Sequence, residues 1–133
     1  MKVVFTDTSF FLASLNPDDE LHEKAIAISR EVRALRLTTG FVLLEIANSM
    51  SAAGQRPRFV EFYNRLVEHP GARIRPVSEE LFSKGYDLYA VRKDKDWSLT
   101  DCISFVVMSE EGISEALTHD HHFEQAGFTR LLT

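Results

Sequence analysis

The segment KVVFTDTSFFL, residues 2–12, predicts the start of an alternating α/β fold. Its first residues, Lys2–Phe5, are apolar and rich in β-branched side chains, which favours a short buried strand. The strand ends at Thr6–Asp7, and a short helix containing Phe10 and Phe11 follows. A carboxylate, Asp7, therefore stands directly after a buried strand, where an unpaired charge is costly to bury.

Short strands and helices alternate along the rest of the chain. Strands are predicted at Lys2–Phe5, Leu37–Thr39, Ala72–Val77, Glu115–Thr118 and Phe128–Leu132. After the first short helix, helices are predicted from Asp18 or Asp19 to about Arg36, at Phe41–Ala53, at Arg58–Glu68, from Ser78 to about Val91, and at Thr100–Glu111. This order predicts an α/β fold in one domain, residues 1–133, with a mainly parallel central sheet covered by helices on both faces.

Composition limits the classes of protein to which the chain can belong. It is 44% hydrophobic over 133 residues, which predicts a compact domain with a real core. No apolar stretch reaches membrane-spanning length, and the N-terminal segment does not resemble a signal peptide. The single cysteine, Cys102, cannot form an internal disulfide, so we expect a cytoplasmic protein. The net charge of −5 argues weakly against a general nucleic-acid binder.

Four acidic residues occupy positions where a chain normally places apolar residues or turns. Asp7 and Asp120 follow short strands, Glu45 lies inside an apolar helix, and Asp101 begins another. Because ligands bind at the carboxyl ends of parallel strands, all four should meet at that edge. Asn48 and Ser49 share the helix face of Glu45 and extend its polar stripe.

An all-oxygen cluster of this kind suits Mg²⁺ or Mn²⁺ rather than zinc. Such an ion activates a water molecule and stabilises charge on a phosphodiester. Metal-dependent hydrolysis of a phosphodiester is therefore the favoured function. Whether one ion or two bind is left open.

The ordered set of motifs resembles a PIN domain, and most closely the VapC-like toxin ribonucleases. The resemblance rests on Asp7-Thr8-Ser9, on Glu45 in a helix after Thr38-Thr39, on Leu99-Thr100-Asp101, and on the segment from Thr118 to Phe123. It covers essentially the whole chain. It implies a three-layer α/β/α sandwich and a Mg²⁺- or Mn²⁺-dependent endoribonuclease that cleaves single-stranded or loop RNA.

The resemblance also implies roles for individual residues and for partners. Metal-ligand and catalytic roles carry over to Asp7, Asp101, Glu45 and Asp120. The hydroxyls of Thr8, Ser9 and Thr118 are expected to orient these carboxylates. Toxins of this family imply a homodimer and a small antitoxin that inserts into the cleft. His119, His121 and His122 flank Asp120, where the family often has a basic or small polar residue, and their role is left open.

Other interpretations stay in view. Asp7 and Asp101 are acceptable helix-start residues on their own, Asp120 is a common turn residue, and Asp96 lies near enough to Asp101 to join the cleft. The alternatives for function are a housekeeping RNA-processing PIN nuclease, a phosphoacceptor signalling domain and a non-catalytic interaction module. The phosphoacceptor alternative lacks a paired acidic doublet beside Asp7. The RNA target cannot be predicted from the sequence.

Overall fold

The computed structural model describes residues 2–133, which form a five-stranded sheet in the order β3-β2-β1-β4-β5. Each pair of neighbouring strands is parallel. The strands are β1 (Val3–Thr6), β2 (Leu35–Thr39), β3 (Ala72–Arg75), β4 (Glu115–Leu117) and β5 (Thr129–Arg130). The predicted parallel α/β fold is confirmed.

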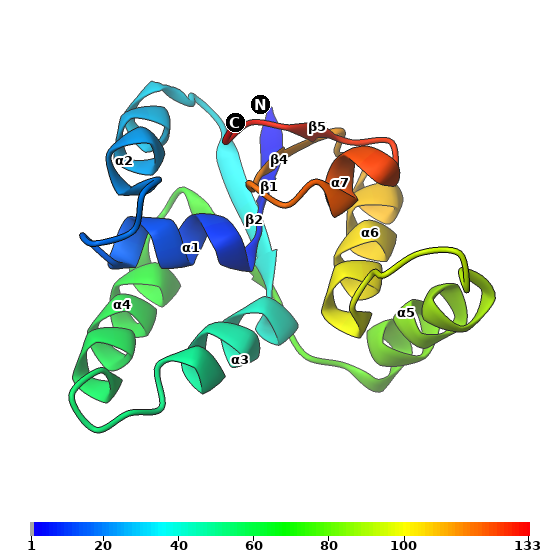
Figure 1. The fold of residues 1–133 in the computed structure, drawn as a ribbon, viewed down its shortest axis with the longest axis horizontal. Helices are drawn as coiled ribbons and strands as arrows, with labels where there is room; N and C mark the ends of the chain where they lie inside the picture. The colour runs from blue at the N-terminus through cyan, green and yellow to red at the C-terminus, as the bar shows by residue number, and fades with distance from the viewer. Residues whose placement is uncertain (1) are drawn as a thin grey trace.

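Helices cover both faces of the sheet (Figure 1). Within residues 2–133 they are α1 (Thr8–Leu15), α2 (His22–Glu31), α3 (Gly40–Ser49), α4 (Arg56–Glu68), α5 (Glu79–Val91), α6 (Leu99–Glu111) and α7 (His122–Gln125). With the sheet seen nearly edge-on, α1, α2 and α4 lie on one side and α5, α6 and α7 on the other (Figure 1). The arrangement is the expected three-layer α/β/α sandwich.

The strand order reverses at β1, which places two of the four carboxylates next to each other. From β1 the chain moves outward to β2 and β3, and it later returns to β4 on the other side of β1. Asp7 follows β1 and Asp120 follows β4, so both lie at the carboxyl edge of the sheet. The N–H of Asp7 donates to the carbonyl of Leu117 at 3.1 Å. This switch in strand order is where ligands bind in open parallel sheets.

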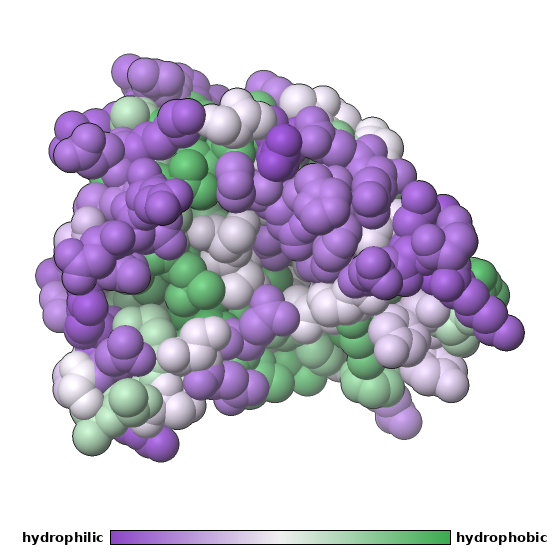
Figure 2. All heavy atoms as spheres, in the orientation of Figure 1, coloured by the Kyte–Doolittle hydropathy of each residue, from purple (hydrophilic) through white to green (hydrophobic). Residues whose placement is uncertain are grey.

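Two apolar clusters hold the layers together. The larger packs Phe5 and Leu37 of the sheet against α3 and α6, and the smaller packs Val4 against α1 and α2. Figure 2 shows a mostly hydrophilic face, with hydrophobic residues in the hollow bordered by α1, α3 and α4. No helix within residues 2–133 is long and apolar enough to cross a membrane.

The second helix differs from the prediction at both ends. Residues 16–21 form turns, in which the carboxylate of Asp19 accepts the N–H of Leu21 at 2.8 Å, and α2 begins only at His22. At the other end, Leu35 and Arg36 belong to β2, not to the helix. Leu35 and Arg36 pair with Val3 and Val4 of β1, so sheet pairing overrides the helical spacing that the sequence suggests.

The remaining differences are smaller. Helix α3 ends at Ser49 and not at Ala53, and β5 is only two residues long, within the predicted Phe128–Leu132. Helix α7 was not predicted at all. The predicted helix end at Glu111 is confirmed, and the next residue, Gly112, ends the helix with the left-handed φ of 68°.

Candidate active site

The four acidic residues meet in one cavity of about 350 Å³. Asp7 is the N-cap of α1, Glu45 lies in the second turn of α3, Asp101 lies in the first turn of α6, and Asp120 precedes α7. The cavity is lined by Asp7, Thr8, Ser9, Leu12, Glu45, Asp96, Ser98, Asp101, Asp120 and His122. The expected convergence at the carboxyl edge of the sheet is therefore what the structure shows.

Hydroxyl groups orient Asp7. The Oγ1 of Thr118 donates to Oδ2 of Asp7 at 2.9 Å, and the Oγ of Ser9 donates to the same oxygen at 3.4 Å. The two hydroxyl oxygens are 3.0 Å apart. Asp7 is only 3% exposed and Thr118 is fully buried, so the bond between them lies in the protein interior. The remaining carboxylate oxygen of Asp7 has no such hydroxyl partner among residues 2–133.

Glu45 is held by a hydroxyl from the neighbouring helix. The Oγ1 of Thr8 donates to Oε1 of Glu45 at 2.5 Å, which ties the start of α1 to the middle of α3. Asn48 behaves differently from the prediction: it is exposed and does not line the cavity. Ser49 uses its hydroxyl on the backbone carbonyl of Glu45, at 3.1 Å, and not on a carboxylate.

Asp101 is fixed by a reciprocal cap at the start of α6. The N–H of Asp101 donates to Oγ of Ser98 at 3.0 Å, and the N–H of Ser98 donates to Oδ2 of Asp101 at 3.3 Å. This capping box satisfies two backbone donors and fixes the carboxylate as well. The same oxygen, Oδ2, lies 3.2 Å from Nδ1 of His122.

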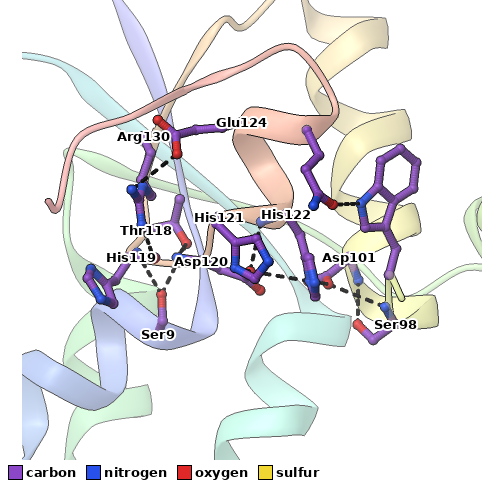
Figure 3. Close-up of polar contacts among 12 residues, drawn as sticks. Ser9, Ser98, Asp101, Thr118, His119, Asp120, His121, His122, Glu124 and Arg130 are labelled. Atoms are coloured by element: carbon purple, nitrogen blue, oxygen red, sulfur yellow. Dashed lines mark hydrogen bonds and ion pairs between the residues drawn. The ribbon is translucent and has the colours of Figure 1, made fainter. Parts of the chain in front are cut away.

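Asp120 lies in the loop between β4 and α7, with its neighbours arranged around it (Figure 3). Its N–H donates to Oγ1 of Thr118 at 3.0 Å, so one threonine contacts both Asp7 and Asp120. Its Oδ1 accepts the N–H of His122 at 2.9 Å and lies 3.3 Å from Nδ1 of that histidine. His122 therefore bridges the carboxylates of Asp101 and Asp120.

The cluster carries unbalanced negative charge. Burial, together with the nearby carboxylates of Asp101 and Asp120, raises the pKa of Asp7 to about 7, against the lowering effect of Thr118. Burial and then the charge of Asp120 also raise the pKa of Asp101. No lysine or arginine within residues 2–133 forms an ion pair with any of the four carboxylates. A cation placed among them would relieve this repulsion.

Sequence reasoning missed or undervalued three residues of the cavity. Ser98 carries a recognisable signal, because Ser-x-x-Asp before an apolar run is a capping-box pattern. His122 gives no such signal, since its contact with Asp101 joins residues 21 positions apart. Asp96 was named only as lying near enough to Asp101 to join the cleft, and it lines the cavity.

Comparisons with known proteins agree with this geometry. A model of the PIN domain family matches residues 4–129. The 23S rRNA-specific endonuclease VapC20 of Mycobacterium tuberculosis is 27% identical over 130 residues, covering 97% of this chain and 98% of VapC20. The crystal structure of M. tuberculosis VapC20, described as a sarcin-ricin loop cleaving toxin, has a TM-score of 0.89 at 25% identity. It covers 98% of this chain and 99% of that one.

A toxin-antitoxin complex from Klebsiella pneumoniae contains a chain of the same fold. Its TM-score is 0.60 at 14% identity, with 89% of this chain and 87% of that chain covered.

Proposed function

The chain belongs to the PIN domain family, and on that premise we propose that its carboxylate cluster holds a divalent cation with which it cleaves RNA. The reaction is hydrolysis of phosphodiester bonds by an endoribonuclease of the toxin type, as in the relative VapC20. The proposed ligands are Asp7, Glu45, Asp101 and Asp120. The observation that carries the proposal is their convergence on one cavity at the switch in strand order.

The donor set fits a hard cation. Four carboxylates from four separate segments supply oxygen atoms only, which is the chemistry that Mg²⁺ and Mn²⁺ prefer. The raised pKa of Asp7 points the same way, because a buried carboxylate without a cation resists ionisation. When bound, the cation supplies an activated water and stabilises charge on the phosphodiester.

Hydrogen bonds within the protein orient the carboxylates. Thr118 and Ser9 fix Oδ2 of Asp7, and Thr8 fixes Oε1 of Glu45. Ser98 fixes Oδ2 of Asp101 from the backbone. These three carboxylates are thus held in place before substrate arrives, so little rearrangement is needed during the reaction.

The test is cleavage of RNA by wild type, Asp7→Asn and Asp101→Asn, with Mg²⁺ or Mn²⁺ and with a chelator. A sarcin-ricin loop oligonucleotide is the first substrate, because the relative VapC20 is described as cleaving that loop. An unrelated single-stranded RNA is the second. We expect both variants to lose more than about 100-fold in rate, since changes outside the ligand shell alone give about 10–100-fold.

Asp87→Asn is the matched control, because Asp87 is an exposed aspartate on α5 outside the cavity. It should cleave like wild type. Unchanged cleavage in both Asp7→Asn and Asp101→Asn would remove the catalytic assignment. Cleavage that persists in the chelator would show that the reaction does not need a divalent cation.

We further propose an antitoxin partner, since a chain of this fold occurs in the Klebsiella pneumoniae toxin-antitoxin complex. A small gene beside the gene for this chain should encode a protein that copurifies with it and suppresses cleavage. The homodimer implied by the family resemblance is checked by measuring the molar mass in solution. A housekeeping role is favoured if no neighbouring protein binds the chain or reduces its activity.

A further inference from the structure

Two adjacent imidazoles, those of His121 and His122, lie beside the carboxylate of Asp120, and His122 also lines the cavity. One ligand atom from each of Asp120, His121 and His122 lies within 4.8 Å of the other two. The Oδ1 of Asp120 is 3.8 Å from Nδ1 of His121 and 3.3 Å from Nδ1 of His122. The side chains of Asp120 and His122 are 27% and 20% exposed, and that of His121 is 65% exposed. The three side chains are therefore already close together (Figure 3), and His121 is open to solvent.

The spacing of these atoms matches a small metal ion. Two ligands that bind tetrahedral Zn²⁺ at about 2.0–2.1 Å lie roughly 3.4 Å from each other. The separations of 3.3 and 3.8 Å are close to that value. Imidazole nitrogen also suits Zn²⁺, Co²⁺ and Ni²⁺ far better than it suits Mg²⁺, which prefers oxygen.

We propose that Asp120, His121 and His122 form a second metal site, selective for a borderline transition-metal ion such as Zn²⁺. Three protein ligands leave one position for water, as in open zinc sites built from histidine and carboxylate. The single cysteine plays no part, since Cys102 lies buried in α6. The region around Asp120 thus offers two kinds of donor set: the oxygen atoms of the four carboxylates, and the nitrogen and oxygen atoms of Asp120, His121 and His122.

The two sites share Asp120, which couples them. An ion held by His121 and His122 would withdraw this carboxylate from the all-oxygen set, and Oδ2 of Asp101 lies only 3.2 Å from Nδ1 of His122. Zn²⁺ is therefore expected to inhibit cleavage supported by Mg²⁺. Inhibition rests on the proposed nuclease function, whereas Zn²⁺ binding does not.

His119 is a natural control, because it is a third histidine in the same segment of the chain but makes a different contact. Its Nδ1 lies 3.1 Å from the carbonyl oxygen of Leu132, and its own carbonyl accepts a bond from Arg130. In Figure 3 it lies on the other side of Asp120 from His122. Its removal should leave the metal site intact.

The experiment measures binding of Zn²⁺ by calorimetry and of Co²⁺ by its visible absorption, on the whole chain without RNA. Wild type and His119→Ala should bind one ion with the absorption of tetrahedral Co²⁺. The double variant His121→Ala/His122→Ala should lose that absorption and roughly tenfold or more in Zn²⁺ affinity. Asp7→Asn should still bind, because Asp7 belongs only to the all-oxygen set.

Three results would overturn the proposal. The first is a double variant that binds Zn²⁺ as tightly as wild type does. The second is a wild-type protein that binds no Co²⁺. The third is a loss of Zn²⁺ affinity in His119→Ala as large as that in the double variant. A circular dichroism spectrum of each variant shows whether it is folded, and His121→Ala alone, at an exposed position, keeps the test valid if the double variant unfolds. If Zn²⁺ binds while RNA is never cleaved, the site stands and the nuclease function fails.

Discussion

Thr118 donates its hydroxyl hydrogen to Asp7 at 2.9 Å, although 111 positions separate the two residues. The contact joins the end of β4 to the end of β1, the two strands at the switch in strand order. The same hydroxyl oxygen accepts the N–H of Asp120. One buried threonine thus sets the positions of two proposed metal ligands.

Replacing Thr118 by valine should lower both activity and stability. Valine keeps the shape but leaves Oδ2 of Asp7 and the N–H of Asp120 without this partner. The free energy of unfolding should fall by about 1–3 kcal/mol, and RNA cleavage should fall about tenfold or more. Urea unfolding and initial cleavage rates measure the two effects. Thr118→Ser, which keeps the hydroxyl, should recover most of both, and a valine variant equal to wild type would contradict the role.

The variants Asp7→Asn and Asp101→Asn should become more stable while losing activity. Both carboxylates have a raised pKa, mainly because they are buried, so their ionised forms destabilise the metal-free fold. At about pH 8 without metal, Asp7→Asn should gain about 1–3 kcal/mol in unfolding free energy, and Asp101→Asn should change in the same direction. Asp18→Asn, an exposed site, should gain nothing. A loss of stability in both variants would show that the carboxylates serve the fold and not a ligand.

Metal-free stability should fall as the pH rises. The pKa of Asp7 is about 7 in the folded protein and near 3.8 in the unfolded chain, so the folded state binds the proton more tightly. The stabilisation is complete below about pH 4 and is lost as the pH rises through about 7. Its slope is at most about 1.4 kcal/mol per pH unit for this group. Asp101 acts in the same direction.

Urea unfolding in a chelator, across this pH range, measures the slope. Asp7→Asn should flatten it, and saturating Mn²⁺ should flatten it in wild type, because the cation favours the ionised carboxylate. If the slope of unfolding free energy against pH is the same in Asp7→Asn as in wild type, the slope comes from other groups.

The sequence was sufficient to predict where the carboxylates lie. Asp7 and Asp120 follow strands, and parallel strands all end at the same edge, so chain order alone places both residues at that edge. Glu45 was predictable because a charged residue inside an apolar helix indicates a functional role. Asn48 was not: it shares a face with Glu45 on an ideal helix, but α3 ends one residue later and Asn48 remains exposed.

The contacts that hold the carboxylates were beyond sequence reasoning. The bond of Thr8 to Glu45 spans 37 positions and depends on how α1 packs against α3. Helix α7 is four residues long, too short to show any periodicity. Arg36 was assigned to a helix because local spacing carries no information about the two strands that pair with β2.

A comparison of Ser98 with Ser78 separates the contribution of a helix cap to stability from its contribution to metal binding. Each is an N-cap whose hydroxyl accepts an N–H, from Asp101 at 3.0 Å in α6 and from Leu81 at 3.2 Å in α5. Alanine at either position should lower the unfolding free energy by about 1 kcal/mol. Only Ser98→Ala should also weaken Mn²⁺ binding, since Ser98 lines the cavity and its hydroxyl holds the backbone N–H of Asp101, while the backbone N–H of residue 98 still donates to the carboxylate.

Calorimetric titration with Mn²⁺ measures the metal affinity of both variants, and urea unfolding measures their stability. Equal Mn²⁺ affinity in the two variants would mean that the capping box supports only the helix. A selective loss in Ser98→Ala would mean that the hydroxyl that caps α6 also positions Asp101 as a metal ligand.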